Sequence, residues 1–193
     1  MHDEPPIAEP AHCLDMGLAQ LVEPARRVAW VCRPDDLPST AALDLRSDRP
    51  NRWSDDGEPT IYVSGDPGLA LIETGRHLED LKRTSQLLRV DLRLRAVLDL
   101  RRQAVRMELE LPAGDWWVLD RDRTRAVAKQ VRSSGACEGM LVPCAGALDQ
   151  DERWNAIVFA DDPAAVAHLL GDPRPAGSVI LEAPAIPANE RAG

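Results

Sequence analysis

An arginine, a tyrosine and a glutamate stand out in the segment RWSDDGEPTIYVSGDPGLALIE, residues 52–73. Arg52 opens the segment, Tyr62 is the only tyrosine of the chain, and Glu73 closes an apolar run. These side-chain types suit a nucleotide site. A guanidinium can donate two hydrogen bonds to a phosphate, an aromatic face can bind a flat cation, and a carboxylate can stabilise a developing positive charge. The competing interpretation is architectural: a solvated loop charge, a packed strand residue and an acid early in a helix.

The elements that must position these three residues follow from the local pattern. The run PTIYVSG at 59–65 predicts a strand that carries Tyr62. The Asp-Pro pair that follows suits an N-cap and the first helical position, which predicts a helix over 66–82 with Glu73 in its early turns. Arg52 then falls in a polar loop before the strand.

The rest of the chain predicts a mixture of strands and helices without regular βαβ alternation. Strands are expected at 25–32, 87–100, 115–120, 138–146 and 154–163, and helices at 124–135 and 163–171. This order favours a single α+β domain with a mixed or antiparallel sheet of about six strands and a cleft between its two halves.

The two ends of the chain differ from its middle in composition. Residues 1–20 are predicted to be a loosely ordered lead-in and residues 21–170 the folded domain. Residues 171–193 form a Pro/Ala-rich tail, in which the short apolar run SVILEA suits an edge strand.

Composition and missing motifs exclude several classes of function. The 193 residues carry a formal charge of −9, which argues against a surface for nucleic acid or an anionic membrane. No GxGxxG, GxxxxGK[ST] or GxSxG motif occurs, which argues against a Rossmann dinucleotide site, a P-loop and a nucleophile elbow. The four cysteines form no CxxC pair, so neither a metal site nor a disulfide scaffold is expected. Without a signal peptide or a long apolar run, the chain is expected to be cytoplasmic.

Four segments in order resemble the RES-domain family. The first is RWS..G....IYVSGDPGLALIE, with an Arg-Trp-polar triplet, a glycine, a strand tyrosine and a helical glutamate. LLRVDLRLRAVLDL resembles the family's strand pair, TRAVAKQVRSSGACEGMLVPCAG its helix and Gly-Leu-X-X-Pro-Ser segment, and WNAIVFADDP its asparagine-started closing strand. The resemblance runs from about residue 25 to about residue 165.

The resemblance implies a fold, a substrate and a partner. RES domains are usually toxins of bacterial toxin–antitoxin pairs that consume NAD⁺ by phosphorolysis or hydrolysis, or transfer its ADP-ribose to a protein. Their fold resembles the ADP-ribosyltransferase toxins, with a split, curved sheet and flanking helices. NAD⁺ without a metal, and a helix-turn-helix-type antitoxin as partner, are therefore the expectations. The acceptor and a homo-oligomer stay open.

The resemblance also gives the candidate site residues. Cleavage of the nicotinamide–ribose bond needs a carboxylate near the ribose, and Glu73 is the candidate. Tyr62 is expected to hold the nicotinamide and Arg52 the pyrophosphate. A further family arginine on the first strand matches Arg33, with Arg27 as the competitor.

Two departures from the family pattern favour a second hypothesis. Cys144 stands where the family has its serine, and it is either a weaker hydrogen-bond donor, a nucleophile or a small buried residue. Asp48, Asp55 and Asp56 crowd the loop expected to receive a pyrophosphate. The alternative to an enzyme is therefore a diverged RES-like module that binds a nucleotide or a protein without turnover.

Overall fold

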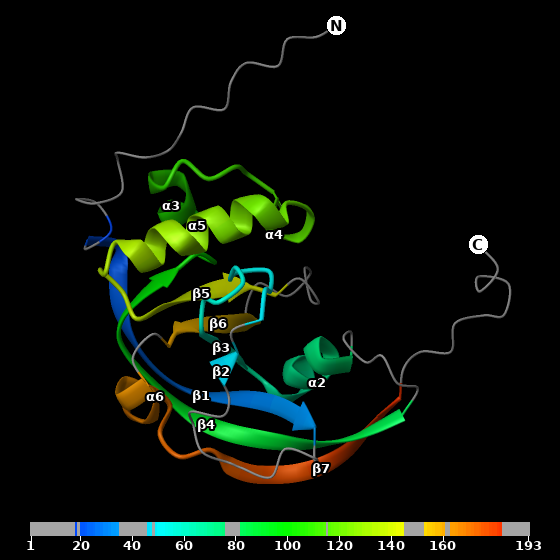
Figure 1. Ribbon diagram of the computed structural model, residues 1–193. Helices are drawn as coiled ribbons and strands as arrows, with labels where there is room; N and C mark the ends of the chain where they lie inside the picture. The colour runs from blue at the N-terminus through cyan, green and yellow to red at the C-terminus, as the bar shows by residue number, and fades with distance from the viewer. Residues whose placement is uncertain are drawn as a thin grey trace, which may run out of the picture.

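The computed structural model describes residues 18, 20–34, 46–47, 49–75, 82–114, 116–144, 153–160 and 163–182. The strands are β1 (Val22–Pro34), β2 (Arg46–Ser47), β3 (Thr60–Ser64), β4 (Lys82–Asp99), β5 (Gly139–Pro143), β6 (Trp154–Phe159) and β7 (Arg174–Glu182). The helices are α2 (Pro67–Gly75), α3 (Gln103–Glu108), α4 (Trp116–Leu119), α5 (Arg121–Ser133) and α6 (Pro163–Leu170). Together they form a mixed α+β fold (Figure 1).

One seven-stranded sheet organises the fold. Its order is β1-β3-β6-β5-β4-β7, with β2 beside β3. The β4–β5 pair is parallel and the other pairs are antiparallel, as expected for a mixed sheet. The sequence predicted a split sheet, whereas β1 also pairs with β4 and closes the sheet on itself. The closure follows from strand length: 13 residues in β1 and 18 in β4 allow pairing from Val22↔Leu98 to Pro34↔Ser85.

Alternation along the strands separates two apolar clusters. Ile61 and Val63 of β3 lie in a cluster that also takes in residues of α6, whereas the intervening Tyr62 borders a second cluster that includes residues of α3 and α5. Figure 1 shows α5 and α6 on different sides of the strands. Successive side chains of a strand point to opposite faces, so the α5 side of β3 is the side that carries Tyr62.

One predicted strand is a helix in the structure. Residues 115–120 were expected to extend, but Trp116–Leu119 form α4. Trp116 is buried and packs edge-on against Trp53, with ring centroids 6.1 Å apart. Asp120 then caps α5 by accepting a hydrogen bond from the Arg123 N–H at 2.9 Å. Tertiary packing and this cap therefore override the strand propensity of two tryptophans and a valine.

The other predicted elements lie close to their expected places, whereas β2 and α3 were not predicted. The helix expected over 66–82 is described as α2 up to Gly75, and residues 76–81 lie outside the described residues. Residues 178–182 of the run SVILEA belong to β7, which pairs only with β4 in the described sheet. Most of the lead-in, residues 1–20, also lies outside the described residues, although Leu18 is described and fully buried.

None of the described helices is long and apolar enough to span a membrane.

Candidate functional site

A cavity of about 830 Å³ lies between the β3 region and α2. Arg52, Tyr62 and Glu73 all line it, although they come from a loop, a strand and a helix. Its volume is in the range of small-molecule sites, roughly 300–1,000 Å³. The structure thus brings together, on one concave surface, the three residues that the sequence singled out.

Local sequence explains how Glu73 reaches the cavity. Asp66 accepts a hydrogen bond from the Leu69 N–H at 2.8 Å, and this N-cap starts α2 directly after β3. Leu69 and Ala70 are buried. Residues four apart share a helix face, so Glu73 lies one turn beyond Leu69 on the side that packs against the sheet. The carboxylate is half-buried there.

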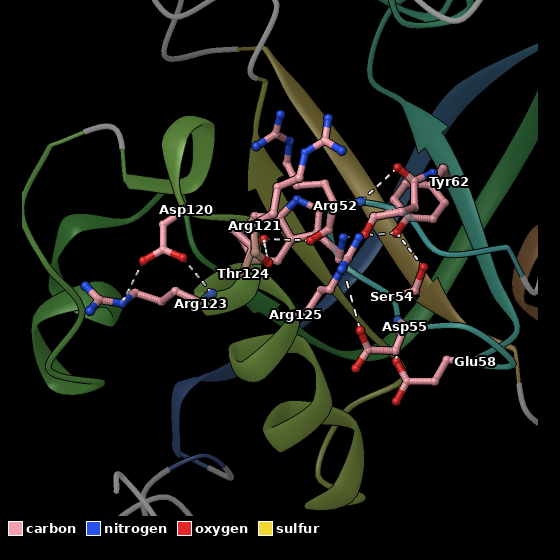
Figure 2. Close-up of polar contacts among 12 residues, drawn as sticks. Arg52, Ser54, Asp55, Glu58, Tyr62, Asp120, Arg121, Arg123, Thr124 and Arg125 are labelled. Carbon is pink, nitrogen blue, oxygen red and sulfur yellow. Dashed lines mark hydrogen bonds and ion pairs between the residues drawn. The ribbon is translucent and has the colours of Figure 1, made fainter. Parts of the chain in front are cut away.

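The Arg52 loop is held by α4 and α5 (Figure 2). The Thr124 hydroxyl, which is fully buried, donates to the Arg52 carbonyl at 2.6 Å. Nε of Arg125 donates to the Asn51 carbonyl at 2.9 Å. The Arg52 guanidinium donates to the Val118 carbonyl at the same distance, 2.9 Å. These bonds fix both the backbone and the side chain of Arg52 at the cavity wall.

The hydroxyl of Tyr62 is tied to the same loop. It lies 3.0 Å from Ser54 Oγ and accepts a hydrogen bond from the Trp53 N–H at 3.3 Å (Figure 2). Burial raises the pKa of the Tyr62 phenol, against smaller lowering effects of these hydrogen bonds, so the phenol stays neutral at physiological pH. The hydroxyl therefore has a structural role, and the ring is the part that a ligand in the cavity can contact.

Cys144 lies directly behind Glu73. Its thiol donates to Glu73 Oε1 at 3.2 Å, and the residue is only 2% exposed. Cys144 packs with Leu69 and is not among the residues that line the cavity. A thiolate here would face the carboxylate charge at short range, which opposes the nucleophile interpretation. The geometry combines the other two interpretations: a small buried residue that is also a weak donor.

The first-strand arginines Arg27 and Arg33 are not among the residues that line the cavity. Arg33 is 7% exposed and shares its face of β1 with Ala25 and Ala29, which belong to the core cluster. Arg27 places its guanidinium 5.5 Å from the ring centroid of Trp154. Trp30, Val31 and Cys32 of the same strand do line the cavity, so the expected role of Arg33 stays a prediction.

The sequence did not single out several polar residues of the cavity wall. Arg83 of β4, Arg121 of α5, Ser64 of β3 and Asn155 of β6 all line it. Arg83 arrives through the non-local closure of the sheet, for which no local signal exists. Asn155 had a signal, since it is the second residue of the strand WNAIVF that was compared with the family's closing strand.

The acidic loop turns away from the cavity. The Asp55 carboxylate lies 3.7 Å from Arg125 Nε. Neither Asp55 nor Asp56 is among the residues that line the cavity. Asp48 lies outside the described residues. The expected repulsion of an anionic ligand therefore does not arise from the two described acids. Among the residues that the structure describes, no three His, Cys, Asp or Glu side chains gather as metal ligands.

Comparisons with known proteins agree with this architecture. Residues 25–177 match the family described as RES domain. A chain from the crystal structure of the M. tuberculosis MbcT-MbcA toxin-antitoxin complex is similar in fold, with a TM-score of 0.61 and 20% sequence identity. The match covers 86% of this chain and 93% of that chain. A comparison with curated protein sequences finds no significant match.

Proposed function

The chain belongs to the RES domain family, and we propose that it is the toxin of a toxin–antitoxin pair that cleaves NAD⁺ between nicotinamide and ribose. The observation that carries this proposal is the single cavity lined by Arg52, Tyr62 and Glu73. The proposal includes an ADP-ribosyltransferase-like fold, action in the bacterial cytoplasm and neutralisation by a cognate antitoxin. The fold shared with a chain of a toxin–antitoxin complex supports the last point.

Glu73 is proposed to stabilise the charge that develops during cleavage. The C–N bond between ribose and nicotinamide breaks, its electron pair leaves with the nicotinamide nitrogen, and the ribose gains oxocarbenium character. A half-buried carboxylate beside the ribose opposes that positive charge more strongly than one in bulk water. An acceptor oxygen then forms the new bond to the same ribose carbon and loses its proton.

The remaining wall residues are proposed to bind the two ends of NAD⁺. The Tyr62 ring offers a face to the cationic nicotinamide. Arg52 is a fixed guanidinium for the pyrophosphate, and Arg83 and Arg121 add two more arginines to the same cavity. A chain with a net charge of −9 thus presents a locally basic wall to an anionic ligand.

Nicotinamide release tests the proposal. The pure protein is incubated with NAD⁺ with and without inorganic phosphate, and the products are separated by chromatography. Free ADP-ribose identifies water as the acceptor, a phosphorylated ADP-ribose identifies phosphate, and a mass increase of added protein identifies transfer. NAD⁺ that stays intact at high protein concentration contradicts all three.

A binding module without turnover is the second candidate. The thiol of Cys144 favours it, because an S–H donor holds the Glu73 carboxylate more weakly than the family's hydroxyl would. This alternative predicts that calorimetry detects binding of NAD⁺ or ADP-ribose, that Arg52→Ala abolishes it, and that no nicotinamide appears.

A further inference from the structure

Ser64 and Asn155 form a polar pair on the cavity wall. They are register partners on β3 and β6, and both line the cavity. Ser64 Oγ donates to Asn155 Oδ1 at 2.8 Å, and Ser64 is only 6% exposed. This is a side-chain hydrogen bond between neighbouring strands, added to the backbone pairing, at the end of β3 from which α2 begins.

In the structure this hydrogen bond uses the oxygen end of the Asn155 amide. An asparagine side chain has one acceptor oxygen and an NH₂ group with two donors. Ser64 occupies the oxygen, and within the described part of the chain Nδ2 donates to no partner. Asn155 therefore offers oriented N–H donors at a wall of the cavity.

The strand registers place this amide between the other candidate groups. Ser64 follows Tyr62 by two residues on the same face of β3, a spacing of about 7 Å along a strand. On the other side Asn155 is opposite Val142 of β5, two residues before Cys144, whose thiol contacts Glu73. The amide thus lies between the Tyr62 ring and the Glu73–Cys144 pair.

We propose that Asn155 binds the substrate directly, donating from Nδ2 to a neutral acceptor oxygen, and that Ser64 is the residue that orients it. This inference rests on the proposed function, since the ligand is NAD⁺. The acceptor is a carbonyl or hydroxyl oxygen near the bond to be cleaved. Two parts of NAD⁺ carry such an oxygen there: the carboxamide of the nicotinamide and the adjoining ribose.

Two substitutions at Asn155 separate donor loss from charge. Asn155→Asp keeps the shape and still accepts from Ser64, but replaces the donors by an anionic oxygen. Asn155→Leu has a similar size and removes the donors without adding a charge. Gln103→Glu, on the exposed start of α3 and away from the cavity, is the matched amide-to-acid control.

Calorimetric titrations measure the effect. ADP-ribose is titrated into the parent chain and into each variant. NAD⁺ is titrated into the same set of proteins carrying in addition Glu73→Gln, a substitution that limits cleavage of the NAD⁺ during the titration. Both Asn155 variants are expected to bind NAD⁺ roughly tenfold or more weakly, because the ligand oxygen is left without its donor. Gln103→Glu is expected to bind as the parent does. If ADP-ribose binding is unchanged, the donor serves the carboxamide; if it weakens too, the donor serves the ribose.

Ser64→Ala provides the test of orientation. It is expected to weaken NAD⁺ binding less than either Asn155 variant, since the amide remains but is free to rotate. Unchanged binding in both Asn155 variants overturns the inference while the proposed function stands. Weakening by Asn155→Asp alone also overturns it, because charge then explains the effect. If the parent proteins bind neither ligand, the proposed function fails and the inference with it.

Discussion

The two walls of the cavity are built in different ways. On the α5 wall, hydrogen bonds from Thr124 and Arg125 hold the Arg52 loop, and the Tyr62 hydroxyl is bonded to Ser54 and Trp53. On the α2 wall, the Glu73 carboxylate has one hydrogen bond within the described residues, from the weak thiol donor of Cys144. The binding groups are therefore firmly positioned, whereas the proposed catalytic group is held loosely.

This difference separates binding from turnover. A rigid wall loses less conformational entropy when the ligand binds, so changes to the α5 wall should appear mainly in substrate affinity. A carboxylate that acts only on developing charge contributes to the transition state, so changes to the α2 wall should appear mainly in kcat. Substitutions at four positions break or sharpen this contrast.

The largest effect is expected for Glu73→Gln. The change keeps the side-chain size but removes the charge that opposes the ribose cation, so kcat for nicotinamide release should fall by roughly 10²–10³-fold. Steady-state kinetics measure it. Glu108→Gln, on the exposed face of α3, is the control and should leave kcat unchanged. A loss confined to KM would place Glu73 among the binding groups.

Tyr62→Leu and Tyr62→Phe separate the ring from the hydroxyl. Loss of the ring should weaken NAD⁺ binding by about tenfold, since stacking and cation–π attraction disappear. Tyr62→Phe keeps the ring but removes the partner of the Trp53 N–H and Ser54 hydroxyl, so the free energy of unfolding should fall by about 1 kcal/mol. Calorimetry and denaturant titration follow the two effects. Equal losses of affinity in both variants would show that the hydroxyl contacts the ligand.

Thr124→Val tests whether α5 positions Arg52. Valine has the shape of threonine but cannot donate to the Arg52 carbonyl, so KM for NAD⁺ should rise by about threefold to fivefold with kcat nearly unchanged. Thr124→Ser keeps the hydroxyl and should restore KM. A fall in thermal stability without any change of KM would leave Thr124 with a purely structural role.

The smallest effect is expected for Cys144→Ser, and it is a gain. A hydroxyl donates to a carboxylate at a shorter distance and more strongly than a thiol, so Glu73 should be held more firmly and kcat should rise by about twofold to threefold. Cys144→Ala, which has no donor, should lower kcat. A loss of all turnover in the serine variant would instead identify the thiol as a nucleophile.

The sequence predicted the site best where neighbouring elements position it. Tyr62 lies in β3 and Glu73 in the helix that follows, and the Asp66 cap and strand alternation account for both placements. The contact between Cys144 and Glu73 joins residues 71 positions apart, and only the family resemblance linked them in advance. Local pattern thus gave β3 and α2, and the pairing of strands brought Cys144 to them.

Non-local packing explains what the sequence did not predict. The closed sheet depends on pairing of β1 with β4, and Arg83, near the start of β4, lines the cavity. The segment that forms α4 has strand-like composition, and its helix is stabilised by contacts such as that between Trp116 and Trp53. The orientation of Asn155 depends on a hydroxyl 91 residues away.

The central claim is that this cavity turns over NAD⁺, and counting nicotinamide molecules released per protein molecule tests it most directly. The pure chain at a low, known concentration is mixed with excess NAD⁺, and nicotinamide is quantified over time beside the Glu73→Gln variant. The account predicts many nicotinamide molecules per molecule of the unmodified chain, and a rate lower by roughly two to three orders of magnitude in the variant. Fewer than one nicotinamide per protein molecule, or equal rates in the two proteins, would contradict it.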